Sequence, residues 1–260
     1  MFAALLLGCG GLRLYPDGAY PSYPSSFTHG RYAFDALSLP DVPDVDGDGV
    51  VDNHLPDVLR LIDTIAPDQG FDPENFDVRL ADNITEHSTI LVDAEQADLT
   101  LQIAFLTATR VDGVLVPCPE SYNESGTPTE VVKGVFLDET TIVAGPTTLR
   151  IEVVGALNTP TVPLQLSRAT VEGTLSSAVM EGRIFAVLPI ETTLSDFIIP
   201  LLPQDGYDID GDGVVESVEE LIAMLEDLAP SLADVELPYG ELGVSVALDY
   251  VAHPASWQDP

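Results

Sequence analysis

Two stretches of the chain place an acidic residue at every second position just before a glycine. The first reads DVDGDGVVD from Asp44, and the second reads DIDGDGVVE from Asp208. Carboxylates packed this densely repel one another unless a cation or a proton lies between them. Carboxylate and carbonyl oxygens are the ligands that calcium prefers, so both stretches are candidate calcium loops.

The second stretch supplies a complete set of calcium ligands. A twelve-residue loop can bind calcium through positions 1, 3, 5, 7, 9 and 12, with a glycine at position 6 for the sharp turn. These ligand positions hold, in order, Asp208, Asp210, Asp212, the carbonyl group of Val214, Glu216 and Glu219, and Gly213 stands at the turn. Magnesium prefers a near-octahedral shell and retains several waters, so Ca2+ is the expected cofactor.

The first stretch lacks one strong ligand. Its corresponding positions hold Asp44, Asp46, Asp48, the carbonyl group of Val50, and Asp52, but position 12 is Leu55. Asp57, two residues further on, is the nearest carboxylate that could complete the shell. Asp57 could equally be an ordinary first-turn helix residue, which the helix dipole favours. A polar Asp-Gly turn without metal is the alternative for both loops, and it has more weight for the first.

The second loop, with the helix expected after it, resembles the EF-hand calcium loop. Pro200, Pro203 and Gly206 interrupt any helix that would run directly into it. The unit is in this respect similar to the loop-helix calcium units of dockerins and thrombospondin type 3 repeats. The resemblance implies that Glu219 binds through both carboxylate oxygens. It also implies that the two loops meet through their position-8 residues, Val51 and Val215.

The first residues, MFAALLLGCG, resemble the lipobox of bacterial lipoproteins. The resemblance implies a signal segment over residues 1–9, a lipid on Cys9 and a protein anchored outside the cytoplasm to the bacterial envelope, in particular the outer membrane. Residues 10–40 are rich in Gly, Pro, Ser and Tyr and lack a sustained period, which predicts a flexible tether. The alternative is a short buried N-terminal segment, with a Cys9–Cys118 disulfide as a further option.

Residues 41–260 are expected to form a single α+β domain. Helical spacing predicts helices over 55–66, where Pro67 ends the first, 76–91 and 217–230, the second packing through Val78, Ala81, Ile84 and Ile90, and a further helix is expected over 188–202. Between the loops, alternation predicts strands over 97–111, 130–137, 147–155, 162–175 and 182–188, followed by a last strand over 243–253. The expected fold is an antiparallel or mixed β-sheet flanked by amphipathic helices, with two loop-helix calcium units.

The charge balance excludes some partners. The chain has 43 acidic residues against 9 basic ones, a formal net charge of −34, so binding to nucleic acid or to anionic lipid is not expected. Membrane association is expected only through a lipid anchor. The four histidines do not form a zinc-peptidase pattern, and the chain has no nucleophile elbow, P-loop or dinucleotide fingerprint.

The combined pattern favours a secreted or surface-anchored calcium-binding protein that is not an enzyme and in which calcium is structural. Binding energy at a folded loop adds directly to stability. Two alternatives stay open, namely a secreted hydrolase with structural calcium and an adhesive or assembly module. A protein or a glycan is a possible partner, and the sequence does not identify it.

Overall fold

The computed structural model describes residues 25–40, 53–65, 73–86, 88–97, 100–129, 131–154, 161–202, 205–208 and 212–258. The first acidic loop, Asp210 of the second loop and Cys9 lie outside these ranges.

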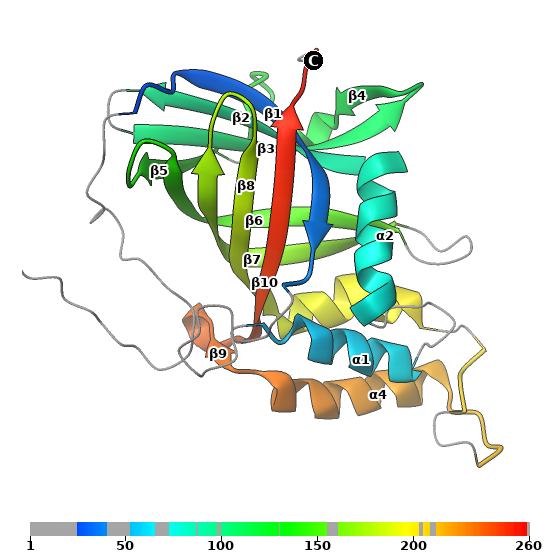
Figure 1. Cartoon of the computed structure of the whole chain (residues 1–260). Helices are drawn as coiled ribbons and strands as arrows, with labels where there is room; N and C mark the ends of the chain where they lie inside the picture. The colour runs from blue at the N-terminus through cyan, green and yellow to red at the C-terminus, as the bar shows by residue number, and fades with distance from the viewer. Residues whose placement is uncertain are drawn as a thin grey trace, which may run out of the picture.

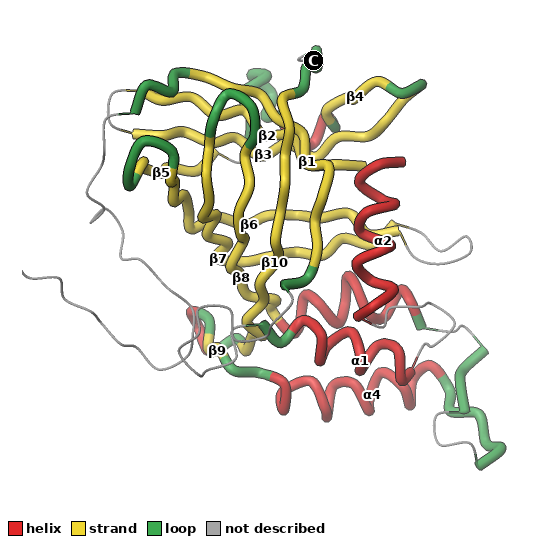
Figure 2. Tube along the Cα trace, in the orientation of Figure 1, coloured by secondary structure: helices red, strands yellow, loops and turns green. Residues whose placement is uncertain are grey.

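Eight antiparallel strands close into a barrel (Figures 1 and 2). In their order around the barrel they are β1 (His29–Ser38), β2 (Ser88–Ala97), β3 (Thr100–Val111), β5 (Val131–Phe136), β6 (Thr141–Val154), β7 (Thr161–Leu175), β8 (Met180–Pro189) and β10 (Leu242–Pro254). The ring closes because β10 pairs with β8 on one side and with β1 on the other. Two short strands extend it: β4 (Val114–Pro117) pairs with β3, and β9 (Val235–Glu236) pairs with β10.

The expected sheet flanked by amphipathic helices is therefore wrong. The strand that closes the ring is β1, which lies inside the range 10–40 predicted as a tether. The tether prediction does not hold for the residues of this strand, since they pair with both β2 and β10. An open sheet would leave the backbone groups of two edge strands unpaired, and closure removes those edges.

Alternate residues of the strands fill the interior of the barrel. β10 turns Val244, Val246, Leu248, Tyr250 and Ala252 into the main core. The Tyr250 ring stacks on that of Phe34, with centroids 5.1 Å apart and planes 8° apart. An eight-stranded barrel is narrow enough for its side chains to fill.

The two glycines that face each other on β7 and β8 let these strands approach closely. Gly173 pairs with Gly182, and a Cβ on Gly173 would lie 2.1 Å from the carbonyl oxygen of Glu181. Larger residues would force the strands apart at this point.

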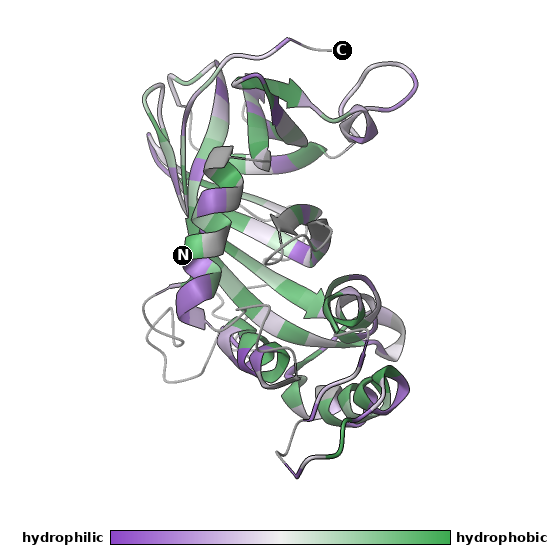
Figure 3. Ribbon diagram, turned by 90° about the vertical axis from the view of Figure 1, so that its right-hand side faces the viewer, coloured by the Kyte–Doolittle hydropathy of each residue, from purple (hydrophilic) through white to green (hydrophobic). Residues whose placement is uncertain are grey.

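The main helices lie at one side and one end of the barrel. α2 (Pro73–Glu86) packs against β1 and β2, whereas α1 (Leu55–Ile65) and α4 (Val218–Leu228) lie below the barrel (Figures 1 and 3). A continuous helical segment lies beside them, made of α3 (Ile190–Thr192), η3 (Thr193–Ile198) and η4 (Ile199–Leu201). Single helical turns form η2 (Pro119–Ser121), η5 (Ala229–Leu232) and η6 (Pro238–Gly240). None of the described helices has the length and apolar character needed to cross a bilayer.

The helix predicted over 55–66 corresponds to α1, which ends at Ile65, but the one predicted over 76–91 differs from α2. α2 ends at Glu86, and Ile90 lies on β2. Its buried residues are Phe76, Leu80 and Ile84, whereas Val78 is 59% exposed. The face that packs is the one that carries Phe76, which is the largest apolar side chain of the segment.

Candidate metal centre

A backbone bridge holds the two ends of the second acidic loop together. Tyr207 and Glu216 each donate an N–H to the other's carbonyl oxygen, and both N···O distances are 3.1 Å. Gly206 makes this approach possible, because a Cβ there would lie 2.0 Å from the Glu216 carbonyl oxygen and its φ is +78°. Asp208, at position 1, directly follows Tyr207, so the bridge holds the start of the loop beside Glu216 at position 9.

Backbone N–H groups hold two of the candidate ligands. The N–H of Gly213 donates to Oδ2 of Asp208 at 2.9 Å, and the N–H of Val214 donates to Oδ1 of Asp212 at 2.8 Å. Gly213 adopts a φ of +89°, which a glycine takes without strain. The chain therefore curls around the side chain of Asp208.

A capping box fixes the start of the helix that follows. The N–H of Ser217 donates to Oε2 of Glu220 at 2.8 Å, and the N–H of Glu220 points back to Oγ of Ser217 at 3.4 Å. The bonds from the Ser217 backbone and side chain lower the pKa of the Glu220 carboxyl. Because Glu220 serves the cap, Glu219 is the first-turn carboxylate of α4 that is available at position 12.

The described residues of the second loop do not form a metal site by themselves. Among the described residues, no group of three or more His, Cys, Asp or Glu side chains is placed to hold a metal ion. Asp210, the position-3 ligand, is outside the described ranges. Val214 and Val215 are 62% and 57% exposed, so position 8 of this loop is open to solvent. Its predicted partner Val51 also lies outside the described residues.

The predicted ligands of the first loop, from Asp44 to Asp52, lie outside the described residues, but Asp57 does not. Oδ1 of Asp57 accepts a hydrogen bond from Nη1 of Arg60 at 2.7 Å, and Oδ2 lies 3.2 Å from Nδ1 of His54. These are the contacts of a first-turn helix residue with its neighbours. Whether Asp57 also serves as a calcium ligand stays a prediction.

A polar junction that the sequence did not suggest ties the start of α1 to the barrel. Asn53 is 2% exposed, and its Oδ1 accepts hydrogen bonds from the N–H of Leu55 at 3.2 Å and of Ala247 at 3.1 Å. The N–H of His54 donates to the carbonyl oxygen of Ser245 at 2.9 Å. The residue type of Asn53 is the one feature of the sequence that points to a structural role, since Asn is a preferred N-cap just before a helix. Its link to β10 depends on the fold.

Ser245 and Asp234 belong to the same junction and do not form a catalytic dyad with histidine. Ser245 is 2% exposed and donates its hydroxyl and its N–H to the two oxygens of Asp234. His54 Nε2 lies 3.9 Å from Asp234 Oδ2. A nucleophilic serine needs access to substrate, and this hydroxyl is buried and donates to Asp234 instead of to a histidine. Its contacts are structural.

Cys118 is a half-buried cysteine that directly precedes η2. The disulfide with Cys9, like lipidation of Cys9, falls outside the described residues. No family model, curated protein or solved structure matches this chain.

Proposed function

We propose that this is a calcium-binding protein of the cell exterior or envelope, that it is not an enzyme, and that calcium stabilises its fold. The observation that carries the proposal is the conformation of the second loop. Its ends are bridged through Tyr207 and Glu216, and its carboxylates at positions 1 and 5 accept backbone N–H bonds from Gly213 and Val214. A cation would relieve the repulsion among the acidic side chains of this loop.

The expected stabilising effect follows from the position of α4, the helix that begins directly after the second loop. α4 begins two residues after Glu216 and buries Leu221 and Leu225 in the core. A metal bound to the folded loop and not to the unfolded chain stabilises the protein by RT ln(1 + [Ca2+]/Kd), about 2.7 kcal/mol at a free concentration of ~100 Kd. Calcium would in this way hold the start of α4 against the barrel.

The proposed location follows from the N-terminal resemblance and from the metal. A lipid on Cys9 would anchor the protein to the bacterial envelope, in particular the outer membrane. Extracellular calcium modules commonly bind with Kd values of roughly 0.1–1 mM, which suits a protein exposed to the outside medium.

The test is thermal unfolding with calcium, with magnesium and with chelator. We expect calcium to raise the Tm of the wild type, and magnesium to raise it less. Asp208→Asn should lose most of the calcium-dependent rise, because it removes one ligand charge while keeping the acceptor for the Gly213 N–H. Asp205→Asn is the matched control, since Asp205 is an exposed acid just outside the loop. A wild-type Tm that does not respond to calcium would refute the proposal.

A second candidate function, assembly or adhesion, is favoured by the β3–β4 ribbon. Val111 pairs with Val114 and Thr109 pairs with Val116, so these four side chains share one face, and all are exposed. Within the described sheet, β4 pairs only with β3, which leaves its other edge open. If this ribbon mediates assembly, Val114→Lys should lower the sedimenting mass, whereas Leu242→Lys, on β10 and also exposed, should not.

A further inference from the structure

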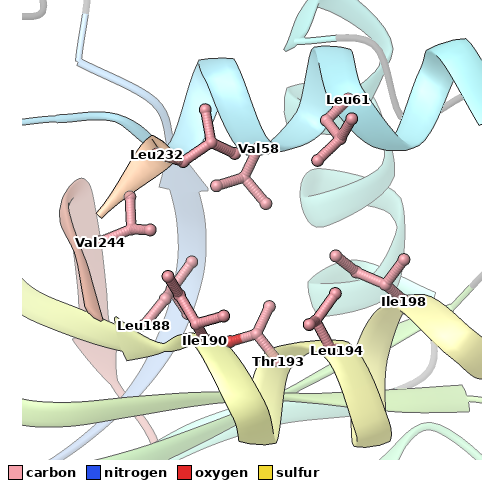
Figure 4. Close-up of a pocket in the computed structure, with 9 residues that line it drawn as sticks. All are labelled: Val58, Leu61, Leu188, Ile190, Thr193, Leu194, Ile198, Leu232 and Val244. Atoms are coloured by element: carbon pink, nitrogen blue, oxygen red, sulfur yellow. The ribbon is translucent and has the colours of Figure 1, made fainter. Parts of the chain in front are cut away.

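An apolar pocket lies below the barrel between α1, the helical segment η3 and β10 (Figure 4). It holds ≈ 310 Å³ of empty space, part of which is open to solvent. Side chains of α1 and η3 point toward one another across the gap in Figure 4. The lining residues are Val58, Leu61, Leu188, Ile190, Thr193, Leu194, Ile198, Leu232 and Val244.

The wall of this pocket selects against charged ligands. Every lining residue except Thr193 is aliphatic, and none carries an ionisable group. A charge placed there would lose its hydration without gaining a partner. Apolar cavities of this kind stay dry and bind small apolar molecules. Uncharged hydrocarbon is therefore the chemistry that the pocket lining fits.

The pocket has a closed inner end and a more open side. Val58, Leu188 and Val244 are 4%, 1% and 2% exposed, so they form the inner wall. Leu61, Leu194 and Leu232 are only partly buried. A chain that entered beside these leucines would have its end against the inner wall and its head group in water.

The backbone of one wall departs from regular helix. In η3 the N–H of Ile199 bonds to the carbonyl oxygen of Leu194, five residues earlier, which is the wider π-type turn. Such turns are rare and frequently occur at functional sites. Leu194 and Ile198, two of the pocket residues, belong to this turn. The widened segment thus coincides with the pocket.

We propose that the pocket binds the end of an aliphatic chain, with the polar head of the ligand at the surface beside Leu61 and Leu194. The proposal goes beyond calcium binding and does not depend on it, because the pocket lining contains none of the candidate metal ligands. It assigns a ligand class to the base of the barrel.

The test is calorimetric titration of the protein, kept in calcium throughout, with primary alkanols from butan-1-ol to decan-1-ol. Burial of each added methylene should tighten binding about fourfold until the pocket is full, after which affinity should level off. Leu194→Trp fills the gap and should weaken binding of the best alkanol at least about tenfold, the worth of a few lost methylene contacts. Leu228→Trp is the matched control on the exposed side of α4 and should bind like the wild type.

Two outcomes would overturn the proposal. One is the absence of saturable binding at every chain length. The other is binding that rises without a plateau and is equal in both tryptophan variants, which is partition onto the surface. If Leu194→Trp does not fold, Leu61→Phe fills the same gap from α1 and should show the same loss.

Discussion

The two loop-helix units of this protein are held in place in different ways. α1 and α4 are each 11 residues long, and each follows an acidic loop. α1 buries Leu55, Val58, Leu59 and Ile62, and the junction at Asn53 ties its start to β10.

Fewer contacts with the core hold α4. It buries only Leu221 and Leu225, while Met224 and Leu228 are exposed. Its start is defined by its own capping box and by the loop before it. The complete set of predicted calcium ligands thus precedes α4, the helix that buries fewer apolar side chains in the core. Bound calcium would give the start of this helix a further attachment.

The largest effect is expected from Leu59→Ala in α1. Leu59 is 0% exposed, and truncation of a buried leucine costs about 2–5 kcal/mol. Denaturant unfolding should show this loss to the same extent with calcium and with chelator. Leu225→Ala in α4 is the comparison, and its cost should be larger in calcium, because weaker packing of α4 also weakens calcium binding to the loop before it. Equal behaviour of the two variants would remove the distinction between the helices.

A second prediction compares the loops themselves. Asp208→Asn should remove more of the calcium-dependent rise in Tm than Asp44→Asn, because only the second loop has a carboxylate at position 12. The loss in Asp208→Asn should approach the ~2.7 kcal/mol that saturating calcium supplies at about 100 Kd. Calcium titrations followed by thermal unfolding measure both. A greater loss in Asp44→Asn would reverse the ranking of the sites.

A third prediction concerns the cap of α4. Ser217→Ala removes the side-chain acceptor of the Glu220 N–H and should cost about 1 kcal/mol. The effect should be greater in calcium, because a loosened helix start also weakens calcium binding to the loop before it. Ser195→Ala is a control, because Ser195 is also an exposed serine near a helix but bonds to Thr192 and Asp196 instead. An equal loss with and without calcium would separate the cap from the metal.

The same cap predicts a pH dependence. The folded protein lowers the pKa of Glu220 through bonds from Ser217, so the ionised carboxylate is stabilised in the folded state. This contribution is fully present above the ordinary pKa of a glutamate and is lost as pH falls through the lowered folded value. Glu220→Gln should unfold with less pH dependence than the wild type over that acidic range. Unfolding curves at a series of pH values provide the measurement.

The smallest effect is expected from Asp57→Asn. Asp57 and Arg60 form a half-exposed pair, and such pairs contribute about 0–1 kcal/mol. Calcium affinity should stay unchanged if Asp57 only serves the helix, and should fall if Asp57 completes the first loop. Arg60→Gln is the control, since it breaks the ion pair and keeps the carboxylate. Isothermal titration with calcium distinguishes the two roles.

The sequence allowed several elements to be predicted but not the closure of the sheet. The helical period from Leu55 located α1, and alternation located β3, β7 and β8, all within a few residues. β1 escaped because Tyr32, Ala33 and Phe34 are all buried, the first and third in the barrel and Ala33 under Trp257. Burial on both faces removes the period of two that marks a strand.

β2 was taken as the end of a helix for the same reason, since Ile90, Leu91 and Val92 are buried in succession. The candidate calcium ligands are named from local spacing alone, and calcium binding at them stays a prediction. The junction of Asn53 with β10 could not be predicted, because its partner Ala247 is remote in the sequence and only the finished barrel brings it near. Features that depend on neighbouring residues can be predicted from this sequence, whereas contacts between residues far apart in it cannot.

The pairing of β1 with β10 also bears on how the chain folds during synthesis. Tyr32 lies opposite Pro254, so the ring is completed only after nearly all of the described chain has been made. Contacts so distant in sequence form slowly, because the entropy of closing a long loop must be overcome first. A nascent chain that ended after β8 would expose two sheet edges, β1 and β8. Such edges pair readily with other chains, so incomplete chains of this protein should be prone to aggregate.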